Sequence, residues 1–423
     1  MVQKAFGCTS TKKRLRHVAK VVKRIISPSQ LSDHQVTHYS IPALSSTGAP
    51  VIESGTNIDS SKFIVTGGEL LVAKINPHRG HLALVKETSG LTVCSSEFVP
   101  LDILSGNRRF FWYVMQSSAV RQQLISIGQS STRSHMRVRP HDILSLEVPA
   151  PSESTQTAIA DFLDRKTAAI DELIEKKQKL LALLAEKRAA LINQAVTKGL
   201  DPKVPMKDSG IPWIRSIPAH WKTARIANVT KKVTNGFVGP TRGLFVDHGI
   251  PYLQSLHIKN NRIIFDSHYF VTPEWSSSKK KSILSACDVL VVQTGDIGQV
   301  AVVPPEFEGA NCHALIILTP NLNDCHGEFL SWVLNSTFGF HSLKSVQTGA
   351  LHPHLNCTHV REIRVPLPPK REQDDITRKL NHESQSIFEV GRSIRKQTAL
   401  LAEYRQALIT AAVTGQLDIG GAA

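Results

Sequence analysis

The sequence has few aromatic residues and no long apolar run. Phe, Tyr and Trp together make up 6% of its 423 residues. A bilayer-spanning helix needs about 18 or more consecutive apolar residues, and none occurs. Residues 1–20 also lack the apolar core of a signal peptide. We therefore expect no membrane partner and a cytoplasmic location.

Paired cysteines are missing as well. The six cysteines are scattered, with no C-x-x-C pair among them: Cys8, Cys94, Cys287, Cys312, Cys325 and Cys357. Such spacing is typical of reduced thiols in a cytosolic protein rather than of a disulfide framework.

Three loops that would carry enzyme chemistry are also absent. There is no G-x-G-x-x-G after an apolar run and no G-x-x-x-x-G-K-S/T phosphate loop. The N/D-P-P-Y/F loop of amino-methyltransferases is approached only by Asn76–Arg79, which lacks the second proline and the aromatic residue. We therefore expect no catalytic site and no cofactor.

Positive charge is abundant and unevenly distributed. The formal net charge is +15 and the isoelectric point is near 9.6. Residues 1–150 carry 18 Lys and Arg against 9 Asp and Glu, and residues 201–369 carry 16 against 12. An excess of this kind favours a polyanionic partner, although a basic but inert surface would have the same composition.

An internal repeat organises the chain. Residues 148–201 align with residues 365–418 at a constant offset of 217, with 23 of 54 positions identical and no gap. Ala182–Glu186 recurs unchanged as Ala399–Glu403, and Gln156 recurs as Gln373. Chance does not produce such a match, so the chain contains a duplicated segment.

The repeated segment predicts a long helix. After a Pro-rich entry, about 40 residues contain no proline, and apolar residues recur every seven positions, which is typical of a coiled-coil seam. We expect helices over 154–197 and 371–414 that pair antiparallel; two amphipathic helices on separate cores are the alternative. The predicted seam and partner-binding residues are Leu163, Ile170, Leu184, Leu191, Leu380, Ile387, Leu401 and Leu408.

The segments before each helix are predicted to be globules of mixed α and β structure. Short β-rich runs are broken by Gly, Pro and Asn, and helical stretches follow at Arg108–Ile127 and Gly327–Val346. The expected fold is α+β, with two globules in tandem, two long helices and a pseudo-twofold axis. The expected boundaries are 1–150 for the first globule, 151–200 for the first helix, 201–369 for the second globule, and 370–423 for the second helix and tail.

This pattern resembles the specificity subunit of Type I restriction-modification systems. The resemblance is carried by the helix entries Val148–Ile159 and Val365–Ile376, the helix exits Ala190–Asp201 and Ala407–Ile419, the linker Ser209–Trp221, and the strand-turn Leu70–Gly80. Residues 1–14 lack a Trp-containing entry like Ile217–Trp221.

The resemblance implies a function and a set of partners. Each globule would be a target recognition domain that reads one half of a bipartite site in double-stranded DNA. The two helices would space the half-sites, so that an insertion near residues 197–200 should widen the gap. They would also bind two methyltransferase subunits, which restriction and translocase subunits would join. A self-contained restriction or modification enzyme and a DNA binder without sequence preference are the alternatives.

Candidate DNA contacts lie in the turns and loops of the two globules. Arg reads guanine and Asn or Gln reads adenine through paired hydrogen bonds, whereas Lys commonly meets phosphate. The candidates are Lys74, Asn76, Arg79, Arg133, His135, Arg137 and Arg139 in the first globule, and Lys279, Lys280, Gln293, Thr294, His352, His354 and Asn356 in the second. Residues 352–359 also hold His and Cys side chains that could bind zinc, but their spacing is irregular and we favour a DNA-facing loop.

Overall fold

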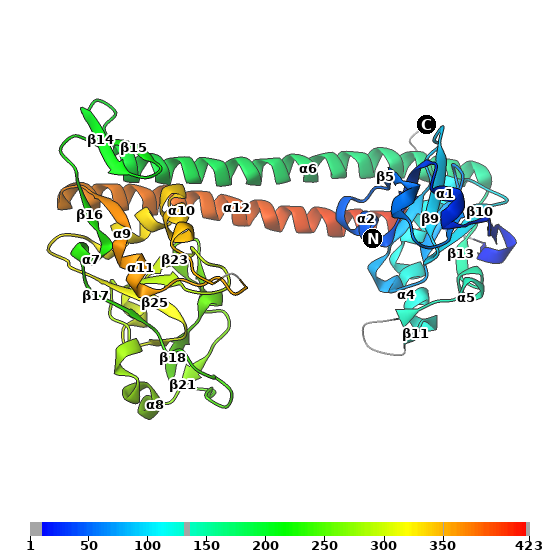
Figure 1. Ribbon diagram of the computed structural model, residues 1–423. Coiled ribbons are helices and arrows are strands. Elements are labelled where there is room, and N and C mark those ends of the chain that lie inside the picture. The colour runs from blue at the N-terminus through cyan, green and yellow to red at the C-terminus, as the bar shows by residue number, and fades with distance from the viewer. Residues whose placement is uncertain (1–10, 131–135, 350, 420–423) are drawn as a thin grey trace, which may run out of the picture. The chain divides into compact units, whose positions relative to one another are not determined.

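The computed structural model describes residues 11–130, 136–349 and 351–419, which fold into two compact units (Figure 1). Unit 1 contains Met1–Gln178 and Arg395–Ala423, and unit 2 contains Lys179–Ile394. The boundary falls inside both long helices, so each unit is built from one globule and a part of each helix.

The two predicted long helices are present. Helix α6 spans Glu153–Lys198 and helix α12 spans Lys370–Val413. Each is followed closely by a glycine with positive φ, Gly199 at 75° and Gly415 at 74°. A left-handed residue is a common helix terminator, because it turns the chain away from the helix axis, and glycine adopts it without strain.

Apolar residues from both helices enter the core of each unit. In unit 1, Leu163 of α6 and Leu408 of α12 belong to one buried cluster, together with residues of the globule. In unit 2, Ile192 of α6 and Leu380 of α12 belong to another. Each globule therefore shares its core with a part of both long helices.

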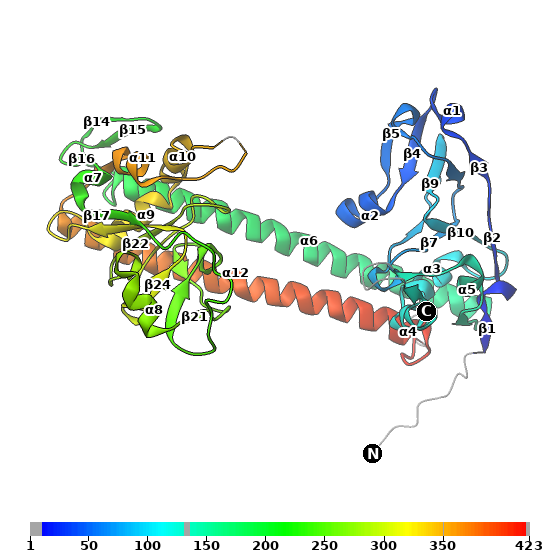
Figure 2. The same ribbon diagram turned by 60° about the horizontal axis from the view of Figure 1, so that its bottom comes forward.

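The described residues of the unit 1 globule form two larger sheets (Figure 2). A four-stranded antiparallel sheet packs against α6 and has the order β2 (Ala19–Val21), β10 (Phe98–Ile103), β7 (Leu70–Ala73), β8 (Leu82–Leu84). A five-stranded sheet has the order β3 (Ile25–Ile26), β6 (Lys62–Ile64), β9 (Leu91–Ser95), β4 (Gln35–Tyr39), β5 (Val51–Ser54). One small buried cluster joins it to the four-stranded sheet, and a second is its own.

The unit 2 globule has a four-stranded antiparallel sheet with the corresponding strand order. Its members are β17 (Thr230–Asn235), β25 (Leu315–Pro320), β22 (Val289–Val292) and β23 (Val300–Val302). A second, three-stranded sheet has the order β21 (Phe270–Val271), β18 (Ile250–Leu253), β24 (Asn311–Cys312). In both globules, therefore, the third and fourth strands of the main sheet are consecutive in sequence and form a hairpin.

Each globule is closed by a pair of strands at the start of its long helix. β1 (Lys12–Arg14) pairs with β13 (Glu147–Pro149), and β16 (Lys222–Arg225) pairs with β26 (Arg364–Leu367). The remaining short helices are α1 (Pro28–Leu31), α2 (Ile41–Thr47), α5 (Pro140–Leu144), α7 (Ile226–Val229), α8 (Pro273–Ser278) and α11 (Cys357–Glu362). The remaining strands are β11 (Gln129–Ser130), β12 (Met136–Arg137), β14 (Met206–Ile211), β15 (Ile214–Pro218), β19 (Ile258–Lys259) and β20 (Arg262–Ile263).

Each predicted helical stretch consists of two helices rather than one. The stretch 108–127 forms α3 (Arg108–Gln116) and α4 (Ser118–Ile127), and the stretch 327–346 forms α9 (Gly327–Leu334) and α10 (Thr337–Ser345). The breaks occur at Ser117 and Ser336, whose side chains accept hydrogen bonds from the backbone of the next helix. A serine that caps a helix adopts an extended backbone, and this ends the helix before it.

Candidate nucleic-acid interface

In unit 2, the strand-turn and the His-rich loop predicted from the sequence lie together. Strand β22 ends at Val292, and the next residue, Gln293, exchanges backbone and side-chain hydrogen bonds with Leu355. Its Nε2 donates to the carbonyl of Leu355 at 2.9 Å. Thr294 then forms a bridge with His354. Gln293 is buried, so its amide holds the loop in place, whereas the Thr294 side chain is exposed.

The corresponding junction of unit 1 has the same construction. Strand β7 ends at Ala73; the carbonyl of the next residue, Lys74, accepts a hydrogen bond from Val138 N at 2.9 Å, and Asn76 N donates to Met136 O at 2.7 Å. The backbone therefore brings Lys74 and Asn76 beside the basic loop that was predicted far along the chain. Two candidates of that loop, Arg133 and His135, lie outside the described residues.

Two basic candidates of unit 1 already have acidic partners. Arg137 pairs with Glu97 at 2.9 Å, and Arg139 pairs with Asp142 at 3.1 Å. Both arginine side chains are more than half exposed, so these surface ion pairs contribute little to stability and can be exchanged for a phosphate. Within the described part of the chain, the exposed Arg79 makes no ion pair.

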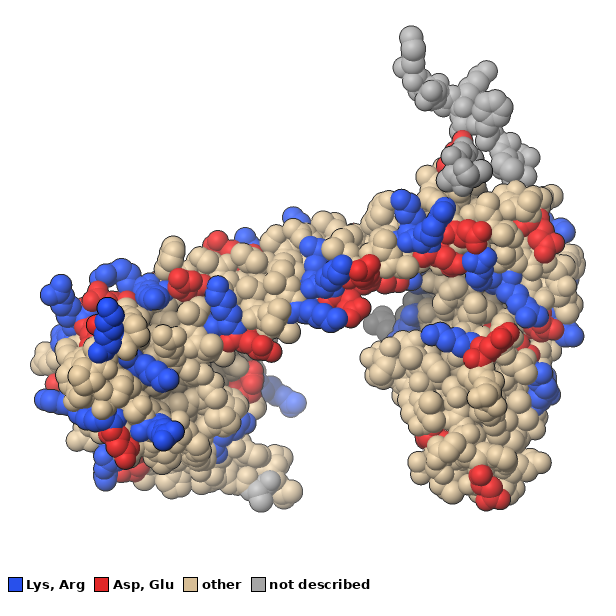
Figure 3. Space-filling model, turned by 90° about the horizontal axis from the view of Figure 1, so that it is seen from above, with Lys and Arg blue, Asp and Glu red and all other residues tan. Residues whose placement is uncertain are grey.

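Lysines line a cavity on the unit 2 globule. The cavity has a volume of about 770 Å³ and is bordered by the end of β17 and by residues 277–282. Lys279 Nζ lies 5.5 Å from the centre of the Phe237 ring, and Lys280 and Lys281 are exposed at the rim. Figure 3 shows Lys and Arg side chains over this globule. Ammonium groups can bind a phosphate, and an aromatic ring beside them can stack on an unpaired base.

The His-rich loop uses its polar atoms within the chain. His354 Nδ1 lies 3.2 Å from His352 O, and Asn356 Oδ1 caps α11 by accepting from His359 N at 2.9 Å. The Cys357 thiol donates to Asn235 Oδ1 at 2.6 Å. No group of three metal-binding side chains occurs among the described residues. His352 is exposed, whereas His354 and Asn356 are partly buried.

The cysteines that the structure describes are free thiols, while Cys8 lies outside the described residues. Burial raises the pKa of Cys94 and of Cys325 to about 12. Because the thiolate is the nucleophile and these side chains stay protonated at neutral pH, neither is a candidate for covalent catalysis.

The residues predicted as the helix seam lie mainly inside the protein. Four are buried: Leu163, Ile170, Leu380 and Leu408. The other four are partly buried: Leu184, Leu191, Ile387 and Leu401. The four buried residues cannot contact a partner directly. They can affect partner binding only by keeping the helices in their folded positions.

Different apolar residues of the helices are exposed, and sequence reasoning missed them. Leu173 and Leu183 of α6 are 42% and 60% exposed, and Val390 and Leu400 of α12 are 48% and 52% exposed. The offset of 217 relates Leu173 to Val390 and Leu183 to Leu400. Repeated apolar residues outside the seven-residue seam were the available signal. We call these four residues the exposed leucine-valine set.

Comparison with known proteins points to one family. The model of the Type I restriction modification DNA specificity domain matches residues 218–389. The chain carries this domain and is similar to Type I specificity subunits. In this family the specificity subunit is a non-catalytic subunit that recognises a DNA sequence and targets the enzyme to it. Among the described helices, none is long and apolar enough to cross a membrane.

Individual specificity subunits are similar over most of their length. The specificity subunit of Type I restriction enzyme MjaIX from Methanocaldococcus jannaschii is 22% identical over 402 residues, which cover 93% of this chain and 86% of that protein. The EcoBI specificity subunit from Escherichia coli is 24% identical over 329 residues, which cover 74% and 66%.

Solved structures share the fold. A chain from a study of complex assembly and conformational transition of the type I R-M system has a TM-score of 0.72 at 17% identity, covering 96% of this chain and 98% of that one. The HsdS subunit from Thermoanaerobacter tengcongensis has a TM-score of 0.51 at 18% identity, with coverage of 96% and 97%.

Proposed function

We propose that this specificity subunit reads an asymmetric, two-part sequence in double-stranded DNA, with one half read by the globule of residues 1–150 and the other by that of residues 201–369. The observation that carries the proposal is the repeated junction between a main-sheet strand and a basic or polar loop. Lys74 and Asn76 lie at one junction, and Gln293 and Thr294 lie at the other. Equal construction with unequal side chains suits two readers of different sequences.

The candidate contacts then divide by role. At the unit 1 junction, Arg79, Lys74 and Asn76 are candidates for base edges, because Arg and Asn pair with guanine and adenine. At the unit 2 junction, Thr294 and His352 are exposed and fill this role. Lys279 and Lys280 hold phosphate, which positions the domain without specifying a sequence.

The two helices, with their boundaries at 151–200 and 370–423, form an antiparallel coiled coil with pseudo-twofold symmetry that spaces the half-sites. Two methyltransferase subunits bind the helices, one on each repeat, and restriction and translocase subunits join this assembly. The exposed leucine-valine set supports the two-fold stoichiometry, because Leu173 and Leu183 on one helix correspond to Val390 and Leu400 on the other. Apolar side chains exposed on a helix suit a protein partner better than a phosphate backbone.

The deciding experiment exchanges one globule. Residues 202–364 are replaced by the corresponding segment of a relative with a different target, and the methylated sites are mapped in a host that carries the partner subunits. We expect one half of the target to change while the other half and the gap remain. A change in both halves would contradict separate reading, and methylation without a common sequence would favour a binder without sequence preference.

A further inference from the structure

Each globule is attached to its long helix by a docking site, and the two docking sites share one backbone hydrogen bond to a glutamine. The unit 1 docking site joins α3 to α6, and the unit 2 docking site joins α9 to α12. The residue before α3, Asn107, donates its backbone N–H to Gln156 Oε1 at 2.8 Å, and the residue before α9, His326, donates to Gln373 Oε1 at 2.9 Å. An offset of 219 relates α3 to α9, and 217 relates α6 to α12.

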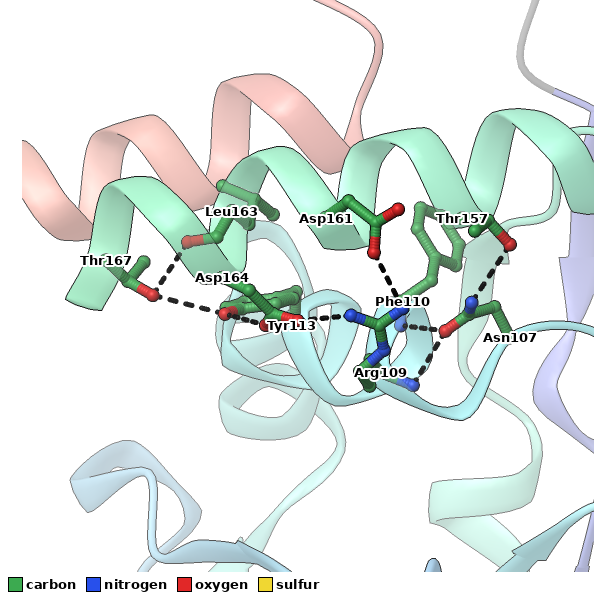
Figure 4. A network of polar contacts seen from close by, with 9 residues as sticks. All are labelled: Asn107, Arg109, Phe110, Tyr113, Thr157, Asp161, Leu163, Asp164 and Thr167. Atoms are coloured by element: carbon green, nitrogen blue, oxygen red, sulfur yellow. Dashed lines mark hydrogen bonds and ion pairs between the residues drawn. The ribbon is translucent and has the colours of Figure 1, made fainter. Parts of the chain in front are cut away.

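In the unit 1 docking site, the globule supplies the cation and the helix supplies the anions (Figure 4). Arg109 of α3 contacts Asp161 at 2.7 Å and also pairs with Asp164. These hydrogen bonds, with that to Asp161 the larger cause, raise the pKa of Arg109. Tyr113 donates its hydroxyl to Asp164 at 2.7 Å, so Asp164 is bound by two side chains of α3.

In the unit 2 docking site, the polarity is reversed. The residue corresponding to Arg109 is Glu328 of α9, and it accepts a hydrogen bond from Asn381 Nδ2 at 3.1 Å. Asn381 corresponds to Asp164, and Trp332, which corresponds to Tyr113, donates its indole N–H to Asn381 Oδ1 at 2.9 Å. Arg378 corresponds to Asp161 and lines the same cavity of about 420 Å³ as Glu328.

We propose that this reversal encodes which globule docks on which helix, so that the two recognition domains are not interchangeable. A globule carrying Glu at the first site would place a carboxylate against Asp161 and Asp164. A globule carrying Arg at the second site would place a guanidinium beside Arg378. Like charges at this distance disfavour each other's charged form. The effect is larger in the first site, where a misplaced Glu would face two carboxylates, than in the second, where Arg378 already pairs with Asp375 at 3.2 Å. The matched ion pairs are partly exposed and add little attraction, so the discrimination comes from the repulsion in wrong pairings.

The first test reverses the charge of residue 109 in the unit 1 docking site, in the full chain. Calorimetric unfolding is compared for the native chain, Arg109→Glu and Arg109→Gln, with Arg165→Glu as a control that reverses a charge on the exposed face of α6. We expect Arg109→Glu to lower the Tm of the affected transition by about 3 °C or more, Arg109→Gln to lower it by less than half as much, and Arg165→Glu to leave it within about 1 °C. Equal shifts for Glu and Gln would overturn the proposal, because loss of contact rather than repulsion would explain both.

The second test transplants the whole polar set. Arg109→Glu combined with Asp161→Arg and Asp164→Asn gives the first site the residues of the second, and we expect at least half of the lost Tm to return. In the second site, Glu328→Arg should lower Tm, and adding Arg378→Asp and Asn381→Asp should restore it. The shifts caused by the single substitutions should shrink between 50 mM and 500 mM salt. A triple variant as unstable as its single variant, at both sites, would overturn the proposal.

Discussion

Gln156 and Gln373 make the same two hydrogen bonds at corresponding positions of the two units. Each donates Nε2 to a proline carbonyl five residues earlier, Pro151 O or Pro368 O, at 2.9 Å. Each accepts the backbone N–H of the residue that precedes α3 or α9. Both glutamines are buried. The amide group of each therefore provides hydrogen-bond partners both for the backbone before its long helix and for the backbone before the globule helix that packs on it. Close to the first of them, Gly106 has φ of 93° and a Cβ there would lie 2.5 Å from Gln156 Oε1.

Replacing either glutamine by leucine should destabilise its own unit. The volume is nearly kept, but a buried N–H and a carbonyl lose their partner, which costs about 1–3 kcal/mol for each unsatisfied group. Unfolding of Gln156→Leu and Gln373→Leu in denaturant, followed by hydrogen exchange at α3 and α9, measures the loss and assigns it to a unit. Exchange that rises equally in both units for a single substitution would contradict the prediction.

The exposed leucine-valine set should govern assembly rather than folding. We expect Leu183→Asp with Leu400→Asp to leave Tm almost unchanged, because both side chains are more than half exposed, and to weaken binding to the modification subunits at least tenfold. Leu163→Ala, which empties a fully buried position, should instead lower stability by about 2–5 kcal/mol. Titration with purified methyltransferase subunit distinguishes the two effects. Full affinity in the double Asp variant would place the partner elsewhere.

Lys279 and Lys280 should contribute to the affinity for DNA but not to its sequence preference. If each neutralises one phosphate, the Lys279→Ala, Lys280→Ala variant should lower the slope of log K against log salt by about 1.8, since each contact contributes about 0.9. The ratio of affinities for target and unrelated duplex should stay the same. Arg79→Ala is the contrasting variant, and we expect it to lower that ratio. An unchanged salt slope in the lysine variant would exclude phosphate contact at this cavity.

His257 should make unit 2 less stable in mild acid. Burial lowers the pKa of this imidazole below its ordinary value of 6.5, and the nearby Lys259 and His268 lower it further. Its Nδ1 accepts from Gln254 N at 2.8 Å, and its Nε2 therefore carries the proton that it donates to Ser267 O at 2.8 Å.

Because the folded-state pKa is depressed, the stability from neutral His257 is complete above pH 6.5 and is lost as the pH falls below that value. Unfolding measured between pH 7.5 and 5.5 should show this loss, and His257→Gln should reduce it. The same pH dependence in both proteins would assign the effect to another group.

The gap between the two half-sites of the target should change when residues are inserted at the boundary between the units. Ala195 and Val196 are buried in the unit 2 core, so an insertion near residues 197–200 follows the packed end of α6 rather than lengthening a free segment. Four residues inserted after Gln178, matched by four after Ile394, should add about 6 Å and nearly restore the helix rotation. We expect the gap in the target to widen by one or two base pairs, as read by mapping methylated sites. An insertion in one helix alone should abolish activity, and an unchanged gap in the matched variant would show that the helices do not set it.

The sequence by itself determined the duplicated helices and the resemblance to one family. Repeated residues at an offset of 217, the absence of proline and the seven-residue apolar spacing specify α6 and α12 to within one residue of the structure, because helix periodicity is a local property. The strand-turns at Leu70–Ala73 and Val289–Val292 were also readable from their apolar runs. Helix breaks at Ser117 and Ser336 were not, because a capping serine and a surface serine look alike in sequence.

Only the tertiary structure decided which apolar and charged residues are available to partners. Leu163 and Leu183 are both leucines of one helix, yet Leu163 is fully buried in the unit 1 core, whereas Leu183 is 60% exposed and belongs to none of the buried clusters of the described residues. Arg109 and Arg79 are likewise indistinguishable by composition, but Arg109 is held by two carboxylates of α6 that lie more than 50 residues away in sequence. Burial and charge pairing depend on contacts between distant segments, which a periodic pattern in one segment does not contain.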